Sequence, residues 1–308
     1  MLARSPHATS FDGKRPVTGA SEVESPPARW HAHPYNRSRY YRLAAAAAPR
    51  VPRAFRTWLA TRMASSLGAR FPAERAAVRR NLARVHPERE AAWLDAAVDR
   101  VYERFAVCFA DLLSLNRGPR AGLWSHVAGI DEQAPTRAAL ARGRGCVSIT
   151  AHLGNWQLAG RLLAVLGRPV HVVMAPEVDP AVGALLDREA PPGVRFVRLT
   201  SPVVGVELVA ALRRGEVVAF QLDRAIGGRG AVEMPFFGHP ATFPLGPFVI
   251  AGAAGAPVVP AFCVLQPDTS YRLHVEPALP VSRGAEPEAL RAAVGILERY
   301  VRAHWDQW

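Results

Sequence analysis

The sequence predicts an α/β fold in which a mostly parallel central sheet is flanked by helices. From Gly145 onward, short β-rich runs alternate with alanine- and leucine-rich helical stretches. This alternation is typical of a parallel sheet covered by helices on both faces. Ahead of it, residues 35–116 show only helical periodicity. The length of 308 residues and the apolar share of 49% fit a globular chain with a substantial core.

We divide the chain into three parts. Residues 1–34 mix charges with five prolines and contain no apolar run, which predicts a disordered tail rather than a secretory signal. Residues 35–118 are expected to form a helical, basic region, and residues 119–308 the α/β core. We expect residues 35–308 to fold as one domain.

One alanine run and three apolar stripes define the helical region. Ala44–Ala48 is a strong helix former that ends at Pro49. The stripes are Phe55, Trp58, Leu59 and Met63; Val78, Leu82 and Val85; and Val101, Phe105, Cys108, Phe109 and Leu112. We expect each stripe to pack against a core. Over residues 40–70 the alternative is a helix lying on a membrane, because basic and aromatic residues alternate there.

In residues 119–308, the pattern of apolar residues predicts the strands and helices one by one. Strands are expected at residues 146–150, 170–174, 194–199, 217–222, 258–264 and 271–275, the last at an edge of the sheet. Helices are expected at residues 158–166, 180–188, 206–213, 248–254 and 289–303.

The positive charge is concentrated near the N-terminus. Residues 35–84 hold twelve arginines and one acid, Glu74, in a chain of net charge +12. Anionic lipid headgroups and nucleic acid are the usual partners of such a segment, and we favour an anionic membrane surface over nucleic acid.

The uncharged run 247–265 is broken by glycines and prolines, so we expect no membrane-spanning helix. Three widely separated cysteines indicate a reducing compartment. We therefore expect a cytoplasmic protein, peripheral on the inner face of the cell membrane.

The sequence lacks several common catalytic and binding motifs. It contains no GxSxG, no Walker loop, no complete GxGxxG and no histidine pair with zinc spacing. The first remaining candidate for a catalytic motif is Thr-Ala-His-Leu-Gly-Asn-Trp-Gln-Leu, residues 150–158. His152 follows a buried strand and precedes a helix, which suits a general base. The alternative for a lone histidine is a structural role.

A second constellation joins a charged, glycine-rich loop to an aromatic pair. It comprises Asp223 and Arg224, the loop 227–230, and the run 232–238, which ends in Pro-Phe-Phe-Gly. Such a region could bind a charged head and an apolar tail; the alternative is a surface loop with core phenylalanines. His152 and Asp223 both fall at strand ends, where α/β sheets bind ligands.

Together, in this order, the two constellations resemble the bacterial lysophospholipid acyltransferase superfamily. The similar branch holds the lipid A biosynthesis lauroyl/myristoyl acyltransferases and the phosphatidylinositol mannoside acyltransferases. The resemblance runs from Tyr40 to Trp308, and His-Leu-Gly-Asn-Trp and Pro-Phe-Phe-Gly are its most specific parts. It implies transfer of a fatty acyl group from an acyl-CoA or acyl carrier protein thioester to a hydroxyl of a lipid or glycolipid. The thioester is the donor substrate, and neither a cofactor nor a metal is expected.

The resemblance also implies catalytic residues. His152 would be the general base that deprotonates the acceptor. The family's signature places an acid five positions after the histidine, but Gln157 stands there. Glu233 is the first candidate to replace that acid, because the matching glutamate lies at the active site in the mannoside branch. Glu177 and Asp223 are lesser candidates.

Further residues are expected to bind substrate. Arginine matches phosphate oxygens well, and the arginines could contact phosphate or the carrier protein. Phe236 and Phe237 are expected to wall an acyl tunnel, with ordinary core packing as the alternative. The full set is Asn155, Trp156, Glu177, Arg188, Asp223, Arg224, Arg229, Phe236 and Phe237.

The glutamine at position 157 keeps other functions open. It cannot neutralise an imidazolium, and the equivalent change in a serine protease costs about 10⁴ in turnover. The acceptor could then be an amine or alcohol of a natural product, or the chain could bind acyl groups or lipids with little turnover. A nucleic-acid or scaffold role of the basic segment is the remaining alternative.

Overall fold

The computed structural model describes residues 50–112, 114, 125–175, 180–188, 190–199, 203–225 and 230–308. The tail predicted for residues 1–34 and the helix predicted at Ala44–Ala48 lie outside these residues, as do the domain boundaries predicted at 34 and 118.

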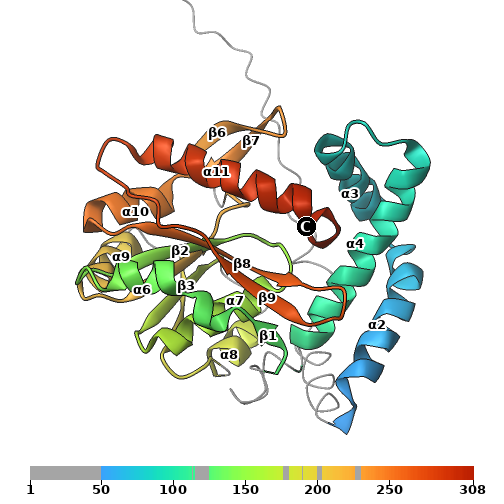
Figure 1. The fold of residues 1–308 in the computed structure, drawn as a ribbon, viewed down its shortest axis with the longest axis horizontal. Coiled ribbons are helices and arrows are strands. Elements are labelled where there is room, and N and C mark those ends of the chain that lie inside the picture. Colours follow the sequence, from blue (N-terminus) through green and yellow to red (C-terminus); the bar gives the residue numbers. More distant parts are fainter. Residues whose placement is uncertain are drawn as a thin grey trace, which may run out of the picture. The chain divides into compact units, whose positions relative to one another are not determined.

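The described residues form one seven-stranded sheet and a separate hairpin (Figure 1). The strand order of the sheet is β1-β9-β8-β2-β5-β3-β4. Its strands are β1 (Val127–Ala128), β2 (Cys146–Thr150), β3 (Val170–Met174), β4 (Val194–Arg198), β5 (Val217–Gln221), β8 (Val258–Leu265) and β9 (Tyr271–Val275). All neighbours run parallel except β8 and β9. The prediction of a mostly parallel α/β sheet is confirmed.

Helices cover both faces of this sheet. Residues Val147 and Ile149 of β2 share a core with α9 (Val203–Arg213), α10 (Gly246–Ala254) and α11 (Glu286–Ala303). Their neighbour Cys146 faces the opposite side, in a core with α6 (Ala134–Leu140) and the 3-10 helix η4 (Leu163–Leu166). The remaining elements of the α/β part are α7 (Trp156–Leu162), α8 (Pro180–Arg188), and the 3-10 helices η3 (Ile130–Glu132) and η5 (Trp305–Gln307).

The hairpin was not predicted, because its sequence resembles a loop. It pairs β6 (Ala231–Phe236) with β7 (His239–Pro244) in antiparallel register. Phe237 and Gly238 form the turn with φ of +49° and +73°, and two successive positive φ values match the twist of a tight hairpin. The prediction that 271–275 is an edge strand is also wrong, because the two-residue β1 pairs with β9 on its outer side.

The N-terminal helices are α2 (Arg53–Gly68), α3 (Pro72–Val85) and α4 (Ala91–Leu112). Core packing is confirmed for Leu82 and Val85 of α3 and for Val101 and Cys108 of α4, which are all buried. Phe105 of α4 departs from that expectation, because its side chain is exposed.

Core packing is wrong for the stripe on α2. Its four members are 41–53% exposed: Phe55, Trp58, Leu59 and Met63. The opposite side of α2, which includes the buried Thr57, Ala64 and Gly68, has small residues. Because α2 packs extensively on α4 and small side chains permit close helix approach, the large apolar residues point outward.

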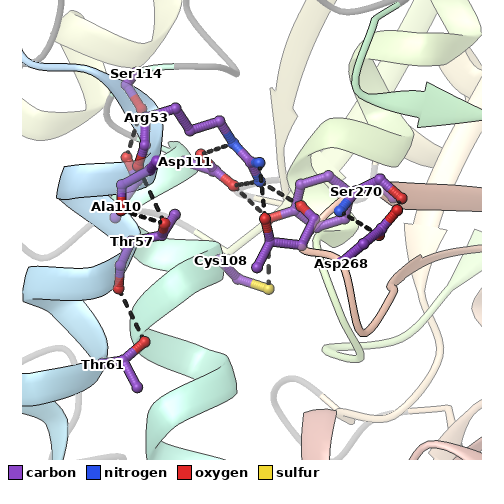
Figure 2. Close-up of polar contacts among 12 residues, drawn as sticks. Arg53, Thr57, Thr61, Cys108, Ala110, Asp111, Ser114, Asp268 and Ser270 are labelled. Carbon is purple, nitrogen blue, oxygen red and sulfur yellow. Dashed lines mark hydrogen bonds and ion pairs between the residues drawn. The ribbon is translucent and has the colours of Figure 1, made fainter.

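A buried ion pair joins α2 to α4 (Figure 2). Arg53 donates from Nε to Asp111 Oδ1 (2.9 Å) and from Nη2 to Asp111 Oδ2 (2.6 Å). The Tyr271 hydroxyl donates to the same Oδ2 at 2.8 Å, and Arg53 also donates to the backbone carbonyl of Thr269 at 2.6 Å. Asp111 is fully buried, so Arg53 of α2 and Tyr271 of β9 meet at one carboxylate of α4.

Two further arginines of the basic segment also pair with α4. Arg75 Nη1 lies 2.7 Å from Asp99 Oδ1, and Arg79 Nε lies 2.6 Å from Asp95 Oδ1.

In the described part of the chain, no helix combines the length and the apolar character needed to cross a membrane.

Candidate active site

The candidate site lies at the carboxyl ends of β2 and β5. These strands are parallel neighbours whose last residues, Thr150 and Gln221, are paired in register. Two positions further along each strand are His152 and Asp223. The chain leaves β2 toward β3 on one side and leaves β5 toward β8 on the other. His152 and Asp223 therefore flank the point where α/β sheets bind ligands.

His152 and Asp223 form a hydrogen-bonded pair. The ring nitrogen Nδ1 of His152 lies 2.9 Å from Asp223 Oδ1, and the His152 backbone N–H donates to Oδ2 at 3.0 Å. The carboxylate is 7% exposed, whereas the imidazole is 22% exposed. Burial alone raises the pKa of Asp223, but the hydrogen bonds from His152 and the nearby positive charges of His152 and Arg224 outweigh it, so the pKa is lowered.

The loop after His152 is held tightly against β8. Gly154 has φ +60°, and a Cβ there would lie 2.3 Å from the carbonyl oxygen of Cys263. The next backbone N–H, of Asn155, donates to that same carbonyl at 2.9 Å. The Asn155 side chain caps α7 by accepting from the Leu158 N–H at 3.1 Å. Only glycine allows this approach, and it fixes His152 at the sheet's rim.

The family model for bacterial lipid A biosynthesis acyltransferases matches residues 40–308. The chain belongs to this family. It is also similar to the phosphatidylinositol mannoside acyltransferases of two Mycobacterium tuberculosis strains, CDC 1551 / Oshkosh and ATCC 25618 / H37Rv. Each is 28% identical over 261 residues, which cover 81% of this chain and 80% of the relative. The protein is therefore an acyltransferase.

The structure brings together only some of the residues expected at this acyltransferase site. The Trp156 ring lies beside the His152 ring, with their centroids 5.0 Å apart. Asn155 is buried as a helix cap. Arg224 is exposed directly after Asp223, and Arg188 is exposed at the end of α8. Glu177 and Arg229 lie outside the described residues.

The two residues expected to assist His152 lie on α7 and β6. Gln157 is exposed on α7 and Glu233 is exposed on β6. Among the described contacts, neither forms a hydrogen bond or ion pair with His152, whose acidic partner is Asp223. Catalytic roles for Gln157 and Glu233 stay predictions.

The phenylalanines of Pro-Phe-Phe-Gly occupy two environments. Phe236 is buried with Phe243 and Trp308, at centroid distances of 5.4 and 5.7 Å. Phe237 sits in the hairpin turn, where its ring lies under Arg302 and its backbone N–H donates to Glu298. A role of either residue in an acyl tunnel stays a prediction.

Sequence reasoning missed Trp308. Its indole Nε1 donates to Asp223 Oδ2 at 3.2 Å. No spacing motif links positions 223 and 308, so a contact of this kind becomes visible only in the folded chain.

A small cavity lies under Trp156. Its volume is about 30 Å³, and Thr150, Gln221 and Gln133 contribute to its lining. Thr150 Oγ1 and Gln133 Nε2 are buried and have no hydrogen-bond partner among the described residues. The space suits one or two water molecules rather than an acyl chain.

Proposed function

We propose that the protein moves a fatty acyl group from an acyl-CoA or acyl carrier protein thioester to a hydroxyl of a glycolipid, with His152 as general base. The observation that carries this proposal is the buried hydrogen bond between His152 Nδ1 and Asp223. It leaves Nε2 as the ring nitrogen that can accept a proton, and it orients the ring.

The step is a nucleophilic acyl substitution. The acceptor oxygen attacks the thioester carbonyl carbon while its proton passes to His152 Nε2. The carbon–sulfur bond then breaks, and the leaving sulfur takes the proton from the imidazolium. Asp223 stabilises the positive charge on the ring between these two events.

Asp223 supplies the carboxylate that Gln157 lacks. A thiol is a good leaving group but an alcohol is a weak nucleophile, so an oriented base matters most for a hydroxyl acceptor. An amine acceptor and a binding protein with little turnover were kept as alternatives because the acid at position 157 is missing. The pairing of His152 with a buried carboxylate weakens that reason.

We assign the acceptor to phosphorylated glycolipids, for which the names of the two mycobacterial relatives are the guide. Arg224 is exposed beside Asp223, and a guanidinium there could hold a phosphate through two hydrogen bonds. Arg188 and Arg229 remain candidates for further phosphate or carrier-protein contacts.

The exposed face of α2 is the proposed membrane contact. Phe55, Trp58, Leu59 and Met63 share one helical stripe of α2 and are all exposed. The guanidinium of Arg62 lies over the Trp58 ring at 5.9 Å, so basic and aromatic groups share this face. Such a face suits the headgroup boundary of an anionic bilayer and a peripheral position on the inner face of the cell membrane.

The enzymatic proposal is tested with donor and acceptor panels. Thiol release from acyl-CoA and acyl carrier protein is measured with phosphatidylinositol mannoside, with an alkyl mannoside that lacks phosphate, and with an alkyl amine. We expect release that depends on the mannoside, with products identified by mass spectrometry, and its loss in His152→Ala. Arg224→Gln is expected to raise KM for the phosphorylated acceptor only. Full activity of His152→Ala would refute the base assignment.

The membrane proposal is tested by sedimentation with vesicles. We expect binding to phosphatidylglycerol vesicles that weakens with salt, and loss of binding in the double variant Phe55→Ser, Trp58→Ser. The matched control is Val203→Ser, Val206→Ser, which changes two exposed apolar residues of α9. Binding to duplex DNA with equal strength, or equal effects of both double variants, would contradict the proposal.

A further inference from the structure

Residues 305–308 follow α11 and connect the helical region to the active site. In Figure 1 this segment, at the label C, lies between α11 and α4, both of which it contacts. Trp305 packs on Trp93 of α4 with ring centroids 4.9 Å apart. Asp306 pairs with Arg104 of α4 at 3.2 Å. The start of the segment is therefore anchored on α4.

The next residue, Gln307, binds the strand and loop beside His152. Its side-chain amide accepts from the Leu265 N–H and donates to the Leu265 carbonyl, both at 2.8 Å. Its backbone carbonyl accepts from the Gly154 N–H at 3.0 Å. Gln307 thus joins the end of β8 to the loop that carries His152.

Trp308 then reaches the catalytic carboxylate. Its indole N–H and the His152 backbone N–H both donate to Asp223 Oδ2, at 3.2 and 3.0 Å. The other oxygen, Oδ1, faces His152 Nδ1 at 2.9 Å. Two donors on Oδ2 resist rotation of the carboxylate, and the Trp308 ring is itself packed edge-on against Phe236.

We propose that Trp308 is a positioning residue of the acyl transfer, which acts by holding the Asp223 carboxylate in the orientation that His152 requires. This inference rests on the proposed function of His152 and Asp223. Trp308 acts through Asp223 and touches no reacting atom.

Loss of the indole donor has two expected effects. The carboxylate rotates more freely, so His152 spends less time in the productive orientation. Its negative charge is also less dispersed, so it holds the imidazolium more strongly. Among the described residues, the charged groups that lower the pKa of Asp223 are His152 and Arg224. The first effect lowers kcat, and the second moves the acidic limb of the kcat/KM profile to higher pH.

The test compares Trp308→Phe with Trp305→Phe, which removes an indole from the same segment without touching Asp223. A hydrogen bond to a charged group corresponds to roughly a tenfold to hundredfold effect. We expect a kcat loss of that size and a shifted acidic limb in Trp308→Phe, and neither in Trp305→Phe. In an Asp223→Asn background, Trp308→Phe should cause little further loss, because both changes remove the same function. Equal behaviour of the two tryptophan variants, or additive losses, would overturn the inference.

A spectroscopic measurement separates this inference from the proposed function. The indole ¹⁵N–¹H resonance that disappears in Trp308→Phe is expected to move upfield in Asp223→Asn, because a neutral amide is a weaker acceptor than a carboxylate. An unmoved resonance overturns the contact even if the wild type is active. If the wild type shows no acyl transfer, or if His152→Ala keeps full activity, the proposed function is overturned even if the resonance moves.

Discussion

The ion pair between Arg53 and Asp111 is expected to hold α2 on the rest of the protein. Asp111→Ala removes the carboxylate that receives both guanidinium hydrogen bonds and the Tyr271 hydroxyl. Burial alone lowers the pKa of Arg53, but the hydrogen bond and charge of Asp111 outweigh it, so the pKa is raised. The arginine side chain is only 15% exposed. The variant therefore leaves a poorly solvated cation without its counter-ion.

The expected cost follows from the burial of both partners. Removing one member of a buried pair destabilises by about 3–5 kcal/mol, because the remaining charge is uncompensated. A typical domain has only about 5–15 kcal/mol of stability, so this loss is a large share. The double variant Arg53→Met, Asp111→Leu replaces both charges with apolar groups, and it should cost less than Asp111→Ala alone.

Urea denaturation followed by circular dichroism measures the effect. The free energies of unfolding are compared only where the variants share the same dependence on urea concentration. A reduced slope would indicate that α2 detaches before the rest of the protein unfolds. Arg79→Met is the control, since its pair with Asp95 is 41% and 64% exposed and should contribute less than about 1 kcal/mol. If Asp111→Ala is no more destabilising than Arg79→Met, the buried pair does not anchor α2.

Two further predictions concern the site. Gly154→Ala should reduce kcat at least tenfold and lower the melting temperature, because Gly154 has φ +60° and a Cβ there would lie 2.3 Å from the Cys263 carbonyl oxygen. The control is Gly160→Ala, whose Cβ would lie 3.8 Å from its nearest neighbour. This control should stabilise α7 by up to about 1 kcal/mol. The lowered pKa of Asp223 stabilises the folded state fully above the unfolded pKa of about 3.9. The excess stability of wild type over Asp223→Asn, measured by urea titration, should therefore be constant at neutral pH and shrink as the pH falls below about 4, and an excess independent of pH would contradict the assignment.

Periodicity predicted most of the α/β core because its strands are short and the central ones, β2, β5 and β8, are almost entirely buried. The run 258–264 has no polar residue to obscure it, and β8 (Val258–Leu265) is buried throughout. No strand was predicted in the run 231–244, because its three prolines, Gly238 and the charged Glu233 break the alternation. In the described part of the chain, β6 and β7 pair only with each other. The sequence signal for these two strands is therefore local and weak.

The site was predicted in part for a similar reason. His152 and Asp223 each follow a strand, and the parallel arrangement of those strands brings both to one rim. The distance between their side chains depends on strand order, which periodicity does not specify. Glu233 ranked above Asp223 by family resemblance alone, and the contact of Asp223 with His152 changes that order. The outward stripe of α2 could not be assigned because spacing defines a face without saying what covers it.

We propose that Asp223 is the carboxylate partner of His152, the proposed general base. The most direct test is kcat for acyl transfer by Asp223→Asn and Glu233→Gln, assayed side by side with the wild type. We expect Asp223→Asn to lose between about 10²- and 10⁴-fold, as when an orienting carboxylate is removed from a catalytic histidine, and Glu233→Gln to stay within about threefold of wild type. A Glu233→Gln variant without activity beside an active Asp223→Asn would show that Glu233, and not Asp223, is the carboxylate that His152 needs.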